Sequence, residues 1–246
     1  MNRHRNPVSR IILPIASLAL ASTCAHAAFI VTPTGATSTT QQDANRAIVR
    51  TIDSSGLYND SDKSAFTGTL TTGNISDVVA GAATTFFGTN TYWLSGSTAM
   101  GGSTVSATET LTFALGGAYD LTSIYLWNYN RDAPTNNRAI KTFDIAFSTD
   151  GGVTYSTAVS AASLGIGDFT LHPATAGSGS ETYVPVDQRD FTATHVGVTH
   201  VQFTSLETHG STGYLGFAEI RFGAIPEPTT ALLGGLGFLA LLRRRR

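Results

Sequence analysis

Cysteine is almost absent from this chain. The 246 residues contain a single one, Cys24, which lies inside a segment that we expect to be removed. Without that segment no thiol remains, so a disulfide framework is excluded. The stability of the folded part must therefore come from its hydrophobic core or from a bound metal ion.

Catalytic motifs are missing as well. The sequence has no G-x-S-x-G nucleophile turn and no H-E-x-x-H zinc motif, and its histidines are scattered. We predict that the protein is not an enzyme. A hydrolase that uses a pair of loop carboxylates, such as Asp187 and Asp190, is the less favoured alternative.

Positive charge is scarce between the two ends of the chain. Seven of the 15 basic residues lie within the first 10 and the last 4 positions, so residues 28–225 contain 8 basic and 16 acidic side chains, a net charge of −8. An acidic surface repels phosphate groups. We therefore expect neither a nucleic-acid partner nor an anionic lipid surface for this part.

The N-terminus has the three parts of a secretory signal peptide. A basic stretch precedes an apolar run at residues 11–21, and Ala25 and Ala27 fit an A-x-A cleavage site. We predict that residues 1–27 are a signal peptide, which signal peptidase removes after Ala27. An uncleaved anchor and a lipoprotein attached through Cys24 are the alternatives.

A second short apolar run lies near the C-terminus, at residues 229–242. It stands between a Pro-Glu-Pro motif and four arginines: Pro226, Glu227, Pro228, Arg243, Arg244, Arg245 and Arg246. As a helix, a run of this length would measure roughly 21 Å, against about 30 Å for the hydrocarbon core of a bilayer. It is too short for an ordinary span, while the arginines can hold it at the cytoplasmic headgroups.

This order of motif, short apolar helix and basic end resembles the PEP-CTERM sorting signal of Gram-negative bacteria. The resemblance, over residues 226–246, implies that an exosortase, a membrane cysteine protease, recognises the motif and cuts near it. It also implies a transient inner-membrane tether, followed by transfer to the cell surface or extracellular matrix, and an association with exopolysaccharide and biofilm. A generic C-terminal anchor is the alternative.

The middle of the chain is rich in Thr, Ser and Gly, and short apolar alternations are separated by turn residues, which is typical of β structure. In residues 121–129, Ile124 and Leu126 lie on the face opposite Tyr125, Trp127 and Tyr129. The predicted strands cover residues 110–115, 121–129, 143–147, 153–155, 201–203 and 214–222.

Helix is scarce by comparison. Residues 41–52 predict a turn or two of helix or a loop, and residues 84–106 and 161–182 predict long loops. Because the strands have no crossover helices between them, we predict a single all-β domain over residues 28–225, an antiparallel sandwich.

Three stretches of this domain resemble the discoidin-like (coagulation-factor C-type, galactose-binding) jelly roll. They are LTFALGGAYDLTSIYLWNYN, NRAIKTFDIAFSTDGGVTY and GYLGFAEIRF, and TIDSSGLYND matches an early loop of the family. The resemblance covers residues 45–222 and implies a jelly-roll β-sandwich. The long insertion between Asp53 and Trp93 departs from the family pattern at the end of the sandwich where ligands would bind.

The same resemblance implies a structural Ca²⁺ ion, held by an early Asp and a Glu of the last strand, here Asp53 and Glu219. Calcium takes six to eight oxygen ligands, and carbonyl and hydroxyl groups around residues 54–57 would supply several of them. The alternative is that Asp53 caps a turn and that Glu219 pairs with Arg221 or Arg50.

A glycan site needs flat apolar faces for the C–H surfaces of a sugar ring and planar polar groups for its hydroxyls. Aromatic residues beside Asn and Arg predict such a shallow site, and the candidates are Tyr92, Trp93, Tyr129, Arg131, Asn136 and Arg138. Trp127 is a further candidate, with core packing as the favoured alternative. Arg131 and Arg138 could instead pair with Asp132 and Asp144.

These features together predict an exported, exosortase-sorted protein of the cell surface or extracellular matrix. Its discoidin-like domain would bind exopolysaccharide or another glycan. A matrix or adhesion protein that contacts other proteins without binding sugar is the first alternative.

Overall fold

The computed structural model describes residues 28–81, 91–129, 135–172 and 183–226. Strands dominate these residues, and the helices are short 3₁₀ turns. The strands are β1 (Phe29–Val31), β2 (Gly35–Ser38), β3 (Leu57–Asn59), β4 (Val78–Gly81), β5 (Trp93–Leu94), β6 (Leu111–Asn128), β7 (Ile140–Ser148), β8 (Val159–Ser160), β9 (Tyr183–Val184), β10 (Asp187–Thr208) and β11 (Gly216–Ile225). The 3₁₀ turns are η1 (Ala44–Arg46), η2 (Ile48–Thr51), η3 (Ile75–Asp77), η4 (Thr135–Arg138) and η5 (Ala161–Leu164).

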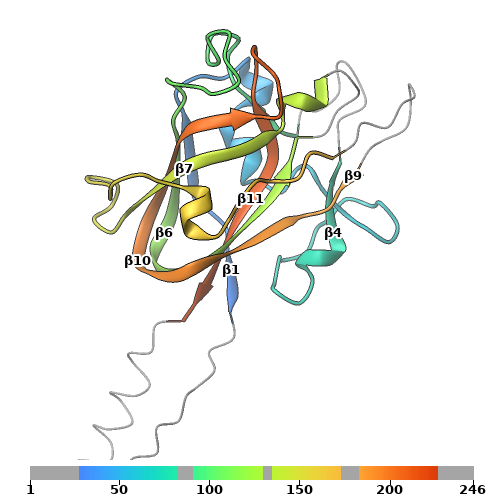
Figure 1. Cartoon of the computed structure of the whole chain (residues 1–246). Helices are drawn as coiled ribbons and strands as arrows, with labels where there is room; N and C mark the ends of the chain where they lie inside the picture. Colours follow the sequence, from blue (N-terminus) through green and yellow to red (C-terminus); the bar gives the residue numbers. More distant parts are fainter. Residues whose placement is uncertain (1–27, 82–90, 130–134, 173–182, 227–246) are drawn as a thin grey trace, which may run out of the picture.

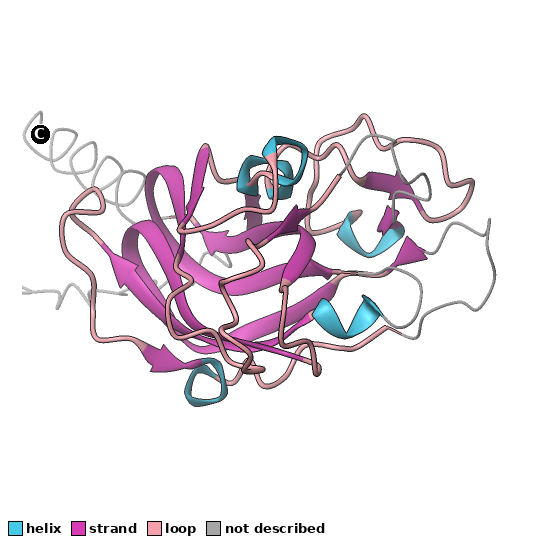
Figure 2. Cartoon of the chain, turned by 90° about the horizontal axis from the view of Figure 1, so that it is seen from above, coloured by secondary structure: helices cyan, strands magenta, loops and turns pink. Residues whose placement is uncertain are grey.

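Two antiparallel sheets make up the fold. The larger sheet has the order β1-β11-β6-β10-β7-β8, with β2 paired to β6 and β5 paired to β11. The smaller sheet has the order β3-β4-β9. Seen from above, the strands of the larger sheet curve around a common core, and the 3₁₀ turns lie at its margins (Figure 2). The predicted antiparallel β-sandwich is confirmed.

The long strands β6 and β10 bend, and this bend turns one sheet into a sandwich. The first part of β6 pairs with β2 and the second with β11, while β10 follows β6 along both parts. Gly116 lies at the bend with a φ of +79°, and a Cβ there would come within 2.5 Å of the Thr34 side chain. Only glycine adopts this backbone conformation without strain. Phe113 of the first part then packs against Phe217 and Phe222 of β11.

The second part of β6 is buried on both faces. Ile124 and Leu126 belong to the main core between the folded halves of the larger sheet. Tyr125 and Trp127 belong to a second core, which the smaller sheet covers. The predicted alternation in residues 121–129 is therefore confirmed, and each face has its own hydrophobic partner.

The two described ends of the domain lie side by side. Phe29 in β1 pairs with Ala224 in β11, and both strands leave the sandwich at the same end (Figure 1). At the opposite end, β11 begins where Gly216 bridges to Ala139, next to the start of β7. The ten residues of β11 span roughly 30 Å at about 3.3 Å per residue, which is the separation of the two ends.

Residues 41–52 and 153–155 differ in how well the structure agrees with their local predictions. The helical prediction for residues 41–52 is met by η1 and η2. The strand predicted at residues 153–155 is wrong, because Asp150 accepts hydrogen bonds from the backbone N–H and the hydroxyl of Thr154 and holds these residues in a turn. These hydrogen bonds also lower the pKa of Asp150.

Within the described residues, no helix is both long enough and apolar enough to cross a bilayer. Of the predicted terminal signals, the described part holds only Pro226. Ala25, Ala27, Glu227, Pro228 and the arginines at 243–246 lie outside it.

Candidate functional site

Trp93 lies in the main core and not on a solvent-facing loop, so the prediction of a stacking platform for sugar is corrected at this residue. Its side chain has 0% exposure. The ring packs edge-on against Phe217 at 5.7 Å between centroids, and the indole N–H donates to the carbonyl of Thr40 at 3.3 Å. This burial follows from the pairing of β5 with β11, which carries Trp93 inward.

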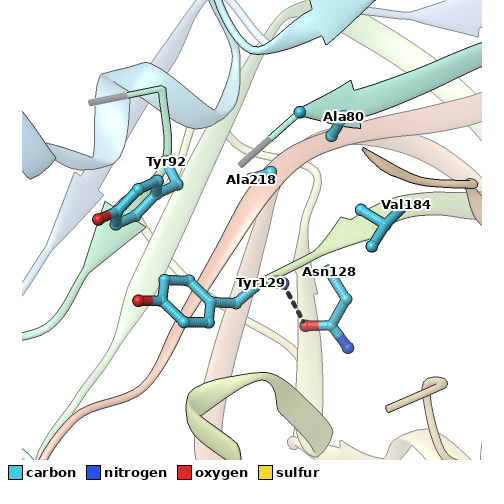
Figure 3. Close-up of a pocket in the computed structure, with 7 residues that line it drawn as sticks. Ala80, Tyr92, Asn128, Tyr129, Val184 and Ala218 are labelled. Carbon is cyan, nitrogen blue, oxygen red and sulfur yellow. Dashed lines mark hydrogen bonds between the residues drawn. The ribbon is translucent and has the colours of Figure 1, made fainter. Parts of the chain in front are cut away.

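Tyr92 and Tyr129 are buried as well, in the second core (Figure 3). Their rings meet edge to face at 5.1 Å, and the Tyr92 hydroxyl accepts a hydrogen bond from Nε of Arg46. The cavity beside them, about 10 Å³ in volume, has room for about one water molecule. In this arrangement neither ring offers a face to a sugar, which corrects the prediction for both.

Trp127 shows the core packing that was its favoured alternative. Its side chain is fully buried, and the indole N–H donates to the carbonyl of Val78 at 2.9 Å. Arg131 lies outside the described residues.

Asn136 and Arg138 lie on η4, at the end of the sandwich opposite the chain ends. The amide of Asn136 donates to the carbonyl of His172 at 3.5 Å. The guanidinium of Arg138 lies over the ring of Tyr214, 4.8 Å from its centroid, and makes no ion pair with Asp144 within the described part. Arg138 and Tyr214 are both partly exposed, and we call this pair the Arg138–Tyr214 stack.

A polar cleft lies at this same end of the domain, where β7 begins and β10 ends. Its volume is about 330 Å³, within the range of small-molecule sites. We call it the polar cleft, and its lining residues are Thr104, Lys141, Glu207, Thr208, His209 and Gly210.

The centre of the polar cleft is an ion pair between two neighbouring strands. Nζ of Lys141 donates to Oε1 of Glu207 at 2.8 Å and lies 3.9 Å from Oδ2 of Asp168. The hydrogen bond to Glu207 raises the pKa of Lys141, and the charges of Glu207 and Asp168 add to this effect. A cationic donor and carboxylate acceptors therefore stand side by side.

His209 and the loop that follows it close one side of the cleft. Nε2 of His209 donates to the carbonyl of Phe169 at 3.0 Å, which leaves Nδ1 as an acceptor in the neutral ring. Burial lowers the pKa of His209. The Thr208 hydroxyl donates to the carbonyl of Ser211 at 2.8 Å, and the Thr208 amide donates to the carbonyl of Thr104 at 2.9 Å. These bonds fix the walls of the cleft.

Lys141, Glu207 and Tyr214 were missed at the sequence level. The only available signal was that Lys141 is a charged residue two positions before the predicted strand at residues 143–147. Its partner Glu207 is 66 residues away, and nothing in the local pattern of either residue indicates the pairing.

The predicted calcium ligands lie close to each other but have protein partners. Asp53 accepts from the Ser55 amide at 2.9 Å and from Arg50 at 3.3 Å. Glu219 accepts from the Ser54 amide at 3.0 Å and pairs with Arg221 at 2.6 Å. Burial raises the pKa of Glu219 to about 7, although Arg221 acts in the opposite direction.

The turn cap and ion pair of the alternative to calcium are therefore both present. No three His, Cys, Asp or Glu side chains in the described segments are grouped as a metal site. Calcium binding itself stays a prediction.

The two carboxylates of the hydrolase alternative differ in their surroundings. Asp187 is buried and accepts from the amide and hydroxyl of Thr170 and from Arg189. Asp190 is exposed and accepts from the side chain of Gln188. That the protein is not an enzyme stays a prediction.

A larger hollow of about 620 Å³ lies between the turn after β7 and the bend of β10. His195 lines it and stacks on Phe147 at 4.0 Å between ring centroids. Nearby valines are unusually exposed, Val196 at 69% and Val153 at 80%. The described residues that line this hollow include no Lys, Arg, Asp or Glu, so it lacks the charged groups of the polar cleft.

Residues 224–246 match the PEP-CTERM protein-sorting motif. The sorting motif indicates export by the exosortase route, with a C-terminus that is anchored transiently in the membrane. This confirms the resemblance identified from the Pro-Glu-Pro motif and the terminal arginines. No curated protein matches the chain significantly.

Several solved structures are similar in fold. The family 32 carbohydrate-binding module of NanJ from Clostridium perfringens, in complex with galactose, has 15% identity and a TM-score of 0.44, over 80% of this chain and 98% of that one. A chitosan-binding module from a chitosanase/glucanase of Paenibacillus sp. IK-5 has 14% identity and a TM-score of 0.40, over 78% and 95%. An F5/8 type C domain from Bacteroides fragilis has 12% identity and a TM-score of 0.40, over 78% and 92%.

Proposed function

We propose that this protein is an exosortase-sorted module of the cell surface or extracellular matrix that binds a hydroxyl-rich glycan in the polar cleft. The observation that carries the proposal is the Lys141–Glu207 pair within a cleft of suitable size. Exopolysaccharide of the producing cell's own matrix is the glycan we expect, with a role in biofilm.

The chemistry of the cleft suits a sugar because each sugar hydroxyl both donates and accepts a hydrogen bond. The ammonium group of Lys141 has three N–H donors, of which Glu207 uses one. The carboxylate of Glu207 and the hydroxyl of Thr104 offer acceptors. The Arg138–Tyr214 stack at the same end of the domain adds the N–H donors of a guanidinium group.

The negative charge of the domain favours glycans that carry no negative charge of their own. Residues 28–225 have a net charge of −8, and Asp168 stands next to the single lysine of the cleft. A polymer rich in uronic acid would be repelled. We therefore propose a neutral sugar or an amino sugar as the ligand.

The position of the cleft also supports the proposal. The cleft is lined by the start of β7 and the end of β10. These strand ends lie at the end of the sandwich opposite β1 and the end of β11 (Figure 1). This end is roughly 30 Å from the point where the chain leaves the domain toward the C-terminal sorting motif. While that motif is held at the membrane, this is the end of the domain further from the bilayer. A site at that end is not covered by the membrane during this stage.

The test is a glycan array that contains neutral, amino and uronic-acid oligosaccharides, probed with the full chain. We expect binding to neutral or amino sugars, and Kd about tenfold or more higher for Lys141→Gln and for Glu207→Gln. The basis is that a hydrogen bond to a charged group contributes about 1.5–3 kcal/mol. Lys63→Gln is the matched control, since Lys63 pairs with Asp60 on the hairpin of the smaller sheet.

Equal binding by the wild type and both cleft variants would refute this site. An array without any binding would favour the matrix or adhesion role that needs no sugar. Release of reducing ends from a bound polysaccharide, lost in Asp187→Asn, would favour the hydrolase.

Sorting is tested by intact mass spectrometry of protein collected from outside the cells. We expect a species that has lost residues 1–27 and the arginines at 243–246, because signal peptidase and exosortase act on the two ends. Recovery of extracellular protein that still carries Arg246 would contradict this route.

A further inference from the structure

The guanidinium group of Arg221 is buried where the last strand meets the loop after η2. Arg221 and Glu219 both have 0% exposure. Because residues i and i+2 of a strand point to the same face, Glu219 and Arg221 of β11 lie together, with Nη1 of Arg221 2.6 Å from Oε1 of Glu219.

Neutral oxygens surround the two Nη groups of this guanidinium, whereas Nε of Arg221 and Oε2 of Glu219 are buried without a hydrogen-bond partner among the described residues. Nη1 also donates to the carbonyl of Ile220 at 2.6 Å and to that of Thr51 at 3.4 Å. Nη2 donates to the Ser54 hydroxyl at 2.7 Å and to the carbonyl of Ile52 at 3.3 Å. One positive group is thus bound by carboxylate, hydroxyl and carbonyl oxygens from two segments about 170 residues apart in sequence.

These oxygens are of the kinds that a hard cation prefers. They also come from the region that the jelly-roll resemblance assigns to calcium, between residue 53 and Glu219. A divalent ion among them would stand next to a fixed positive charge in a place without solvent, where repulsion is screened least. The residues present therefore do not suit a calcium ion while Arg221 is in position.

The backbone at Ser54 has an uncommon conformation, and both members of the ion pair hold it. Ser54 has a φ of +63°, a conformation that is uncommon for a residue other than glycine. Its hydroxyl accepts from Arg221, and its amide donates to Glu219. Both members of the ion pair thus hold the same residue.

We propose that the Arg221 side chain takes the place of a structural cation, so that the domain carries its own positive charge at this position and folds without calcium. The guanidinium attaches residues 51–54 to β11, as an ion would. This inference is independent of the proposed glycan site, which lies at a different place in the fold.

The test measures the thermal unfolding of the full chain in EDTA and in 5 mM CaCl₂. The Tm of the wild type should differ by less than about 1 °C between the two conditions. Arg221→Met should unfold at least about 10 °C lower in EDTA, because Glu219 loses its charge partner. It should recover part of the loss in calcium, since removal of the guanidinium leaves the oxygens free.

The matched control is Arg50→Met, which removes an exposed arginine that pairs with Asp53 in the same region. Its Tm should change by less than about 2 °C, with no response to calcium. A wild-type Tm that rises in calcium would overturn the proposal, as would an Arg221→Met protein as stable as the wild type. If Arg221→Met does not fold, calorimetric titration of the wild type with CaCl₂ decides, and saturable heat would overturn the proposal.

Discussion

A core role and a ligand-binding role for Trp93 predict different results when the residue is replaced. Replacement by Ala removes a fully buried indole that packs on Phe217 and leaves the carbonyl of Thr40 without its donor. Loss of a buried aromatic side chain costs about 3–5 kcal/mol, and an abandoned hydrogen-bond partner costs about 1 kcal/mol. We therefore expect Trp93→Ala to lower the free energy of unfolding by about 5 kcal/mol.

The assay is urea denaturation followed by tryptophan fluorescence. The chain has two tryptophans, so Trp127, buried in the second core, still reports unfolding in the variant. With a slope of about 2.5 kcal/mol per M urea, the midpoint should fall by about 2 M, and Tm should fall by roughly 15 °C. Trp93→Phe keeps an aromatic ring in the core and should lose less than half as much.

The opposite result would refute this account of the core. If Trp93→Ala unfolded at the wild-type urea concentration but no longer bound glycan, the indole would have to lie at a surface site. In that case the pairing of β5 with β11, which carries Trp93 inward, would also be wrong.

Two further predictions concern the bend of the sheet and its pH response. Gly116→Ala should destabilise the domain by about 2 kcal/mol or more in urea titrations, because of the positive φ and the contact of the new Cβ with Thr34. Gly151 has the same φ of +79° but no neighbour within 4 Å, so Gly151→Ala should lose only the stability due to backbone strain. Equal losses in the two variants would refute a role for the contact. Burial lowers the pKa of His195 below its ordinary value of 6.5, so the unfolded chain binds the proton more readily and stability should fall as the pH drops below about 6.5. His195→Phe should flatten this part of the stability profile, and an equally steep profile in the variant would show that other histidines cause it.

The local pattern of the chain was sufficient for most of the strands. In β6 the alternation of Leu111, Phe113 and Leu115 predicted one buried face, and the structure has that face in the main core. The reason is that side chains of a strand alternate between its two faces, so the order of apolar and polar residues indicates which face is buried. The same rule wrongly predicted a strand at residues 153–155. The Asp150 carboxylate accepts a hydrogen bond from the Thr154 amide, and such a side-chain bond competes with strand pairing.

The candidate site was predictable only in part. Asn136 and Arg138 were candidates at the sequence level because Asn and Arg stand beside aromatic residues there; the structure places them on η4, and their role in binding stays a prediction. The ion pair of Lys141 with Glu207 was not predictable, because the two residues meet only through the pairing of β7 with β10. The aromatic candidates failed for a related reason: a flat apolar ring suits a sugar and a core equally well, and only the packing of neighbouring strands decides between them.

The order of residues by itself determined the sorting motif, the acidic charge of the domain and the antiparallel β class, because each depends on composition or on contacts between neighbours in the chain. Tertiary structure decided which aromatic residues are buried, where a polar cleft forms, and that the carboxylate of Glu219 has a guanidinium beside it. These depend on distances between residues far apart in sequence, which the bend of β6 and β10 sets and no local pattern records.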